Sequence, residues 1–428
     1  MTKPQSPRRR PRTEFRVPPP LVQRIDAAGF TGSDLLDDEN GPSALVFWQC
    51  YRDVELWARA GVREGLFRPG RAKARAGEIE ALDQAALAEA KPHLAALLEV
   101  VRCPEAAEAS RIADACSALA GWFEGRGRLR CAVDFAVCAY LASPRQAGLA
   151  VRVARLTRVL AEYPRSTSWF DYSIYLARKA HDWQAYAEAL AGLGNLYFQL
   201  GNFPRARHYH RRCLRAATRN HLREMAGAAY HNLFVLEMDA GNVELAESLA
   251  ARAFASYGPT SPSVARLARD LSRRWTVLGH FERSLPLALE TLNHFSTPAD
   301  RALVWADVAR AAGGAGQIAI FEDAWAESWT LVRRGVTDPV TADVLIDLAR
   351  GAASLAQVRR AAHAAGKALE VARQRKEGRT VLEAESLLDS LHLQTPEPHP
   401  TGLPTTEQLP ELAGGILRAL RELRAAAV

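Results

Sequence analysis

Residues 187–217 read AEALAGLGNLYFQLGNFPRARHYHRRCLRAA. Apolar residues recur at helical spacing on both sides of Gly201-Asn202, which predicts one helix over 187–200 and a second over 204–217. Pro204 falls in the first turn of the second helix, where a missing N–H costs nothing. Gly201 suits the residue after a helix end, which often takes a positive φ. The stretch therefore predicts a hairpin of two helices.

The turn glycine recurs along the chain. Five glycines share this place at separations of 74, 40, 38 and 37 residues: Gly127, Gly201, Gly241, Gly279 and Gly316. Because 74 is twice 37, one turn without glycine fits between the first two. A fixed period of this size is typical of stacked helical pairs. The hairpins begin near Ala113, Ala150, Ala187, Gly227, Ala265, Ala302 and Ala342. Two of them lack the glycine, since the second has Pro164 and the seventh has Ala356. We predict an all-α solenoid of about seven helix-turn-helix repeats.

These hairpins resemble tetratricopeptide repeats. That family places a large residue, Leu-Gly and Tyr in the first helix, and a small residue and an aromatic in the second. The third hairpin matches the pattern at Leu190, Leu193-Gly194, Tyr197, Gly201, Ala206 and His210. The first hairpin follows it at Leu119-Ala120, Phe123, Gly127, Ala132 and Ala139, and the sixth at Trp305, Val308-Ala309 and Gly316. The resemblance implies a right-handed α-solenoid of a bacterial type, with turns longer than in the family's repeat of about 34 residues.

The remaining segments flank the repeats. The expected organisation is a disordered basic tail, an N-terminal helical cap, the solenoid, a Pro-rich linker and an amphipathic helix, over 1–20, 21–112, 113–393, 394–408 and 409–428. Within the cap we predict helices over 43–60 and 72–101, the latter kinked at Pro92. The last helix is expected to dock on its own stack, on a partner, or on a second copy to form a homodimer.

Charge is concentrated at the N-terminus. The net charge is +7, of which the first sixteen residues supply +5, so the body is nearly balanced. The six cysteines include no Cys-x-x-Cys pair or metal-ligand spacing, and we expect them to be buried thiols of a cytoplasmic protein. The N-terminal arginines precede no apolar segment, so no signal peptide is expected.

Catalytic signatures are missing from the sequence. It contains no Gly-x-Ser-x-Gly, no phosphate-binding Gly-x-x-x-x-Gly-Lys-Ser/Thr and no His-Glu-x-x-His. The run from Gly313 to Gly316 is interpreted as a relaxed turn between helices. His208 and His210 point to different helix faces, and His210 occupies a core place. We expect no enzymatic activity, cofactor or metal site.

The resemblance also implies a binding surface. In the family, the first helix of each repeat lines a concave groove, and its ninth place holds Arg158, Asn195, Arg273, Arg310 or Arg350 in five of these hairpins. The expected partner-binding residues are Arg158, Asn195, His231, Arg266, Arg269, Arg273, Arg310 and Arg350. Family members that hold acidic peptides use such residues, so we expect a cationic groove for a partner with an acidic segment. Acidic residues such as Asp114, Glu188, Asp239 and Asp343 are alternative partners for these arginines.

Three functions fit these observations. The first is a cytoplasmic adaptor that binds a peptide or protein partner in the groove. The second is a regulatory sensor, in which a signal peptide or small ligand changes the curvature of the solenoid and so acts on a transcription or signalling partner. The third is a nucleic-acid-associated factor that uses the tail residues Arg8, Arg9, Arg10 and Arg12 without sequence specificity.

Overall fold

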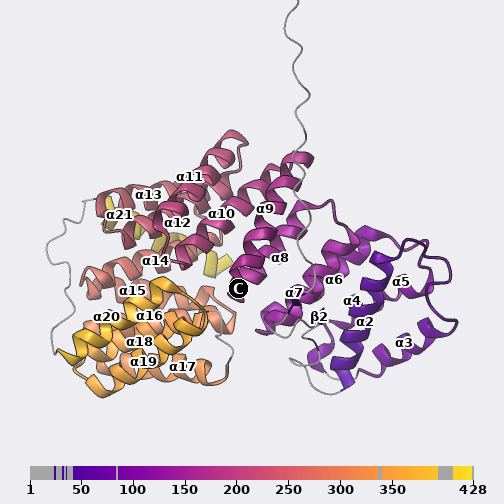
Figure 1. Ribbon diagram of the computed structural model, residues 1–428. Helices are drawn as coiled ribbons and strands as arrows, with labels where there is room; N and C mark the ends of the chain where they lie inside the picture. The colour runs from indigo at the N-terminus through magenta and orange to yellow at the C-terminus, as the bar shows by residue number, and fades with distance from the viewer. Residues whose placement is uncertain are drawn as a thin grey trace, which may run out of the picture.

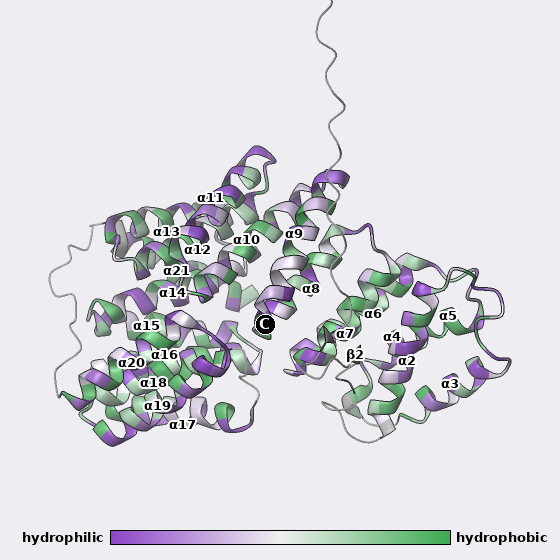
Figure 2. Ribbon diagram, in the orientation of Figure 1, coloured by the Kyte–Doolittle hydropathy of each residue, from purple (hydrophilic) through white to green (hydrophobic). Residues whose placement is uncertain are grey.

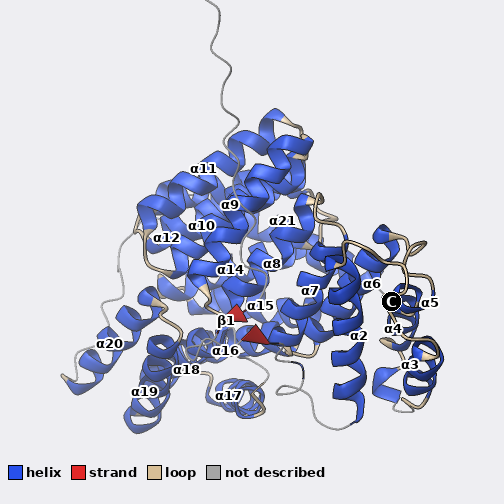
Figure 3. Cartoon of the chain, turned by 45° about the vertical axis from the view of Figure 1, so that its right-hand side comes forward, coloured by secondary structure: helices blue, strands red, loops and turns tan. Residues whose placement is uncertain are grey.

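The protein is a stack of antiparallel helices. The computed structural model describes residues 24–25, 31–32, 35, 42–82, 85–335, 340–393 and 408–426. Within this part, the two strands are the two-residue segments β1 (Arg24–Ile25) and β2 (Thr31–Gly32), which pair antiparallel, and Figure 3 shows how little of the chain they occupy. The tail residues 1–20 and linker residues 394–407 lie outside the described residues.

Seven consecutive helical hairpins form the body of the stack (Figure 1). Their helix pairs are α6 (Ala109–Gly125) and α7 (Leu129–Ala142), α8 (Ala147–Val159) and α9 (Tyr163–Ala180), α10 (Trp183–Gln199) and α11 (Phe203–Arg219), α12 (Arg223–Asp239) and α13 (Val243–Tyr257), α14 (Ser263–Val277) and α15 (Phe281–Thr291), α16 (Pro298–Gly314) and α17 (Ile318–Arg333), and α18 (Thr341–Ser354) and α19 (Val358–Gln374). After the seventh hairpin comes α20 (Gly378–His392), which takes the place of the first helix of an eighth repeat and ends the array. The predicted all-α solenoid of seven repeats is confirmed.

The turns inside the hairpins have one backbone conformation. Gly201 has φ 75° and Gly316 has φ 69°, and the three other turn glycines are also left-handed. In the second and seventh hairpins this place is taken by Ala161 with φ 59° and Ala356 with φ 57°. Pro164 lies in the first turn of α9 and not in the αL position. The left-handed turn therefore recurs at the same spacing even in the two hairpins that have alanine in place of glycine.

The predicted single helix over 72–101 is wrong. The structure has α3 (Arg71–Glu80), a 3₁₀ turn η1 (Ala85–Leu87), α4 (Lys91–Leu97) and α5 (Glu99–Arg102). Pro92 lies in the first turn of α4, so it begins a helix where we expected it to kink one. The other cap helix is α2 (Pro42–Arg59), which matches the prediction.

Helix α2 joins the cap to the first hairpin. The Phe47 and Phe123 ring centroids are 4.9 Å apart, and Trp57 Nε1 donates to the Pro104 carbonyl over 2.8 Å. Buried Arg75 of α3 lies 2.9 Å from the Asp53 carboxylate of α2. The cap and the first hairpin therefore share one apolar core, which continues through α10. Figure 2 shows hydrophobic residues along every hairpin, as a stack without a single centre requires.

Small residues let the helices approach closely. A Cβ on Gly194 would lie 2.4 Å from the ring of His210, so this pair fits only because the residue is glycine. Burial lowers the pKa of His210 to about 3, so the ring is a neutral core residue, as predicted. Gly313 is not in a relaxed turn as expected. It lies inside α16, where a Cβ would meet the Gly351 carbonyl oxygen of α18 at 2.3 Å.

The solenoid closes on itself at α20. Gly378 begins this helix, and a Cβ there would lie 3.2 Å from the Leu200 carbonyl oxygen at the end of α10. Arg375 Nη2 donates to the Val159 carbonyl over 2.6 Å, across 216 residues of sequence. The Arg379 guanidinium lies 5.3 Å from the centroid of the Phe198 ring. The turn after α19 thus contacts the second hairpin, and the start of α20 contacts the third.

The C-terminal helix α21 (Gln408–Ala426) docks on its own chain. It contacts α13, α14 and α15 and buries Ala413, Ile416, Ala419 and Leu420 in their apolar core. Arg424 Nη1 lies 2.9 Å from the Glu290 carboxylate of α15. A homodimer through the buried face of this helix would therefore require α21 to leave this position.

Candidate partner-binding wall

Charged side chains of five first helices meet on one surface, which we call the inner wall. It consists of Arg269, Arg273, Arg310, Arg350 and Arg379 with Asp239, Asp270, Asp307, Asp343, Asp347 and Glu383. Arg379 of α20 lies 3.8 Å from Asp239 of α12, although these helices are four repeats apart. Such a contact is possible only if the first helices face a shared interior. The inner wall is therefore the concave surface of the solenoid.

Asp347 of α18 is the centre of the wall. Its side chain is fully buried, and its two oxygens lie 2.8 Å from Arg310 Nη1 and 3.2 Å from Arg273 Nη1. The pKa of Asp347 is lowered to about 2 because Arg273, Arg310 and Arg350 together outweigh the cost of burial. One carboxylate thereby joins three successive repeats.

Asp307 of α16 is held differently. Its carboxylate accepts a hydrogen bond from Arg269 Nε of α14, while its second oxygen Oδ1 is buried and receives none. Burial raises the pKa of Asp307 above the ordinary range, although Arg269 and Arg273 act in the opposite direction. Asp307 is therefore the less stably ionised of the two buried carboxylates.

The wall is more open toward α20. Arg350 Nη1 of α18 lies 3.1 Å from the Glu383 carboxylate, and Arg379 Nη2 lies 2.8 Å from Asp343. The side chains of Asp239, Asp343 and Glu383 keep 24–28% of their surface exposed, whereas Asp347 keeps none. Charged groups of a ligand can therefore reach the α20 end without unfolding the repeats.

His231 of α12 extends the wall by two hydrogen bonds. Its Nε2 lies 2.8 Å from the Asp270 carboxylate of α14, and its Nδ1 lies 3.3 Å from the Tyr257 hydroxyl. The pKa of Asp270 is lowered by the bond to His231 and by Arg269 and Arg273, against the effect of burial. This histidine therefore links two repeats, and the described residues hold no group of three or more possible metal ligands around it.

Three expected partner-binding residues lie apart from this network. Arg158 of α8 donates to Gln199 Oε1 over 2.7 Å, and burial lowers the pKa of Arg158 to about 10. Asn195 of α10 is half-buried, and Arg266 of α14 is exposed. The structure thus brings together His231, Arg269, Arg273, Arg310 and Arg350. Tail residues Arg8, Arg9, Arg10 and Arg12 lie outside the described part.

The expected cationic groove is wrong, because the inner wall carries carboxylates as well as arginines. Five arginines of the inner wall face six carboxylates, and each arginine lies within 4.0 Å of at least one of them. An unpaired buried guanidinium is costly, so the repeats supply carboxylates in register. Of the four anticipated pairing partners, Asp239 and Asp343 contribute, whereas Asp114 and Glu188 are not part of the inner wall.

The other carboxylates were missed, although the sequence carries a signal for them. An Asp-x-x-Arg motif recurs in three successive first helices, at Asp270–Arg273, Asp307–Arg310 and Asp347–Arg350. A separation of three residues places both charges on the same helix face. Repetition at 37 and 40 residues then aligns each motif with the next repeat. Reading the sixth place together with the ninth would have predicted a paired wall.

Comparisons with known proteins concern the fold. No protein-family model and no curated protein matches the sequence. The Rap conjugation gene regulator of the plasmid pLS20, in complex with the Phr* peptide, is 13% identical, covering 75% of this chain and 97% of that chain with a TM-score of 0.50. A Rap protein complexed with competence and sporulation factor is 10% identical, covering 82% and 97% with a TM-score of 0.45. The TPR2AB domain of yeast Sti1, in its pHSP90 complex, is 16% identical, covering 66% and 98% with a TM-score of 0.25. The first likeness agrees with the repeats described above, and the chain has a TPR-like helical-repeat fold.

No helix in the described ranges is long and apolar enough to cross a membrane.

Proposed function

We propose that this protein is a non-catalytic adaptor that binds a peptide or protein partner on its inner wall. The observation that carries the proposal is the set of partly exposed ion pairs that α18 and α20 present there. Ion pairs that are mostly removed from water often add little net stability, because the cost of desolvation offsets their attraction, so folding alone gives a weak reason for so many of them. Such ion pairs suit a binding surface, because each charged side chain can leave its partner within the protein and pair with a charged group of the ligand.

The fold supports the same proposal. The pLS20 regulator, which shares the fold, is solved with a peptide bound. Stacked repeats present an extended concave surface, and that geometry accommodates an extended chain. Here the concave surface carries the charges that would align such a chain.

The partner segment is proposed to carry acidic residues and also at least one cation. A partner carboxylate can replace Glu383 on Arg350 or Asp343 on Arg379. Each replacement leaves a wall carboxylate without its arginine, and a cationic group of the partner would then neutralise it. A segment with both signs of charge fits this wall better than a purely acidic one.

The experiment is a capture of partners from the source cells with two matched variants. The double substitution Arg350→Gln/Glu383→Gln removes an inner-wall ion pair without changing the net charge. The control Arg373→Gln/Glu385→Gln removes an exposed pair between α19 and α20. A partner lost only with the inner pair supports the proposal. A partner retained by both variants, with both folded by circular dichroism, would contradict it.

A regulatory sensor is the second candidate, and the contact between α20 and α10 favours it. This contact includes the Arg379 guanidinium over the Phe198 ring of α10, and Arg375 beside it donates to the Val159 carbonyl at the end of α8. A ligand that competes for Arg379 would loosen the closure and change the shape of the solenoid. If the protein is such a sensor, addition of the ligand should change the radius of gyration of the protein measured by small-angle X-ray scattering.

A further inference from the structure

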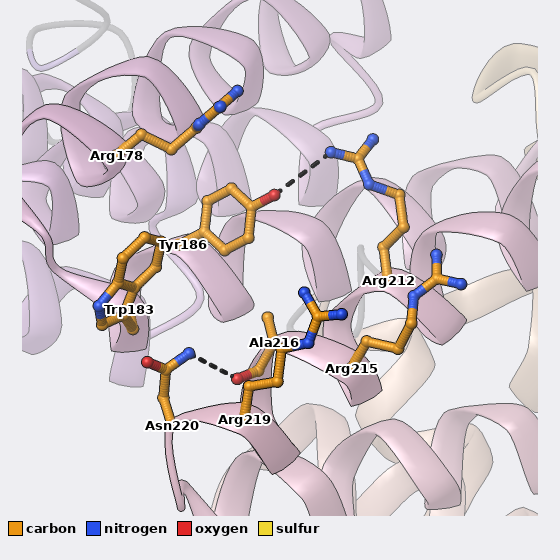
Figure 4. A pocket seen from close by; sticks show the side chains of 8 residues that line it. All are labelled: Arg178, Trp183, Tyr186, Arg212, Arg215, Ala216, Arg219 and Asn220. Atoms are coloured by element: carbon orange, nitrogen blue, oxygen red, sulfur yellow. Dashed lines mark hydrogen bonds between the residues drawn. The ribbon is translucent and has the colours of Figure 1, made fainter.

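A second charged site lies between α9, α10 and α11 and includes no residue of the inner wall. A cavity of about 450 Å³ opens there, and it is shown in Figure 4. Arg178 of α9 and Arg212, Arg215 and Arg219 of α11 line it, with Trp183 and Tyr186 from the start of α10. Its size falls within the range of pockets that hold small molecules.

The four arginines of this pocket have no carboxylate partner. No ion pair among the described residues includes Arg178, Arg212, Arg215 or Arg219, whereas every arginine of the inner wall has one. Helix α11 contains six arginines and no Asp or Glu. Asp171 is near enough to Arg212 to feel its charge, and burial raises the pKa of Asp171 while Arg212 lowers it, but Asp171 does not line the pocket. Four like charges around one cavity repel one another, and a bound anion would relieve that repulsion.

The opposite side of the pocket is aromatic. Trp183 and Tyr186 meet edge to face with ring centroids 5.8 Å apart, and Trp183 keeps 36% of its surface exposed. Arg212 Nη2 donates to the Tyr186 hydroxyl over 3.4 Å, as the dashed line in Figure 4 shows. That bond fixes one ring against one guanidinium. An exposed indole beside fixed cations offers a stacking surface for a flat ring.

We propose that this pocket binds a nucleoside polyphosphate, with its phosphates on Arg212, Arg215 and Arg219 and its base against Trp183. Guanidinium groups match phosphate oxygens in pairs, and several of them converge here. The base contributes stacking on the indole. The volume of about 450 Å³ favours a single nucleotide over a nucleic-acid strand, which needs a continuous cationic groove with several stacking positions.

Isothermal titration calorimetry of the full chain with ATP and GTP tests this proposal. Pyrophosphate and a ten-residue oligouridylate serve as comparison ligands. We expect micromolar to submillimolar binding of at least one nucleotide, with an affinity that falls as salt increases. Pyrophosphate should bind at least tenfold more weakly, because it cannot stack on Trp183.

Matched variants locate the site. Arg215→Glu/Arg219→Glu should weaken nucleotide binding at least tenfold, and Trp183→Ala should weaken it for nucleotides but not for pyrophosphate. Arg211→Glu, on the same helix but outside the pocket lining, should leave the affinity within twofold. Circular dichroism of each variant shows whether its helices remain folded.

Four results would contradict nucleotide binding in this pocket. No nucleotide binding, binding that survives Arg215→Glu/Arg219→Glu, equal affinity for pyrophosphate, or binding of the oligonucleotide alone would each overturn the proposal. The adaptor function is tested independently, because the inner-wall variant Arg350→Gln/Glu383→Gln should bind nucleotide as the unmodified chain does.

Discussion

Two alanines occupy a backbone conformation that favours glycine. Ala356 has φ 57° at the turn of the seventh hairpin and is exposed. A non-glycine residue in this region costs about 1–2 kcal/mol, partly offset by the entropy that glycine loses on folding. Ala356→Gly should therefore stabilise the chain by about 0.5–1 kcal/mol in urea unfolding.

The same substitution in a helix should have the opposite sign. Ala326 is exposed inside α17, and Ala326→Gly should destabilise the chain by about 1 kcal/mol. If both substitutions were equally destabilising, the left-handed turn at Ala356 would be wrong.

Asp347 should contribute more to stability than any exposed carboxylate of the wall. Asp347→Asn leaves Arg273 and Arg310 without their shared partner, which should cost about 3 kcal/mol at pH 7. Asp343→Asn, at a carboxylate with 28% exposure, should cost about 1 kcal/mol or less. Urea unfolding of both variants measures the difference, and equal costs would contradict the central position of Asp347.

This contribution should depend on pH in a defined direction. The pKa of Asp347 is lowered from 3.8 to about 2 in the folded protein. A lowered pKa means stability that is present above the unfolded pKa and lost as pH falls through the folded pKa. The gap between the unmodified chain and Asp347→Asn should therefore narrow by about 2 kcal/mol from pH 5 to pH 2. A gap independent of pH would show that Asp347 is not ionised in the fold.

For single residues, the sequence predicted the arginines of the inner wall but not most of its carboxylates. Arginines were placed on the concave face by their repeat position, and five of the eight expected residues meet there. The pairing of their charges was not predicted, because the two members of most pairs lie on different helices and only the repeated Asp-x-x-Arg motif indicates that they meet.

Single helices show where local patterns suffice. The helices of the third hairpin were predicted to within four residues, and α10 begins earlier than expected because the Asp182 side chain accepts from the Ala185 N–H. The cap was harder to predict. Apolar spacing over 72–101 resembles one helix, and only the packing of α3 and α4 around α2 shows the break.

Helix α21 should depend on its buried face for docking. Ile416 is fully buried among α13, α14 and α15, so Ile416→Asp should undock the helix. Hydrogen exchange of residues 408–426 should then become fast, while α18 and α19 stay protected. Arg418→Asp, at an exposed position of the same helix, is the control and should leave the protection unchanged. Protection that persists in Ile416→Asp would contradict this docking.

Closure of the whole solenoid was not predictable from the repeats. The period gives the number of hairpins, but small rotations between repeats add up and determine whether the ends meet. Arg375→Ala/Arg379→Ala should open the contacts with α8 and α10 and increase the radius of gyration in small-angle scattering. Arg373→Ala, on the exposed end of α19, should not change it. An unchanged radius in the double variant would show that apolar packing alone closes the array.

The central claim is that a partner binds where the first helices face one another. Hydrogen–deuterium exchange of the full chain, with and without the captured partner, tests it most directly. We predict added protection in α14, α16, α18 and α20, around Arg273, Arg310 and Arg350. Protection confined to the second helices α13, α15, α17 and α19 would contradict the claim.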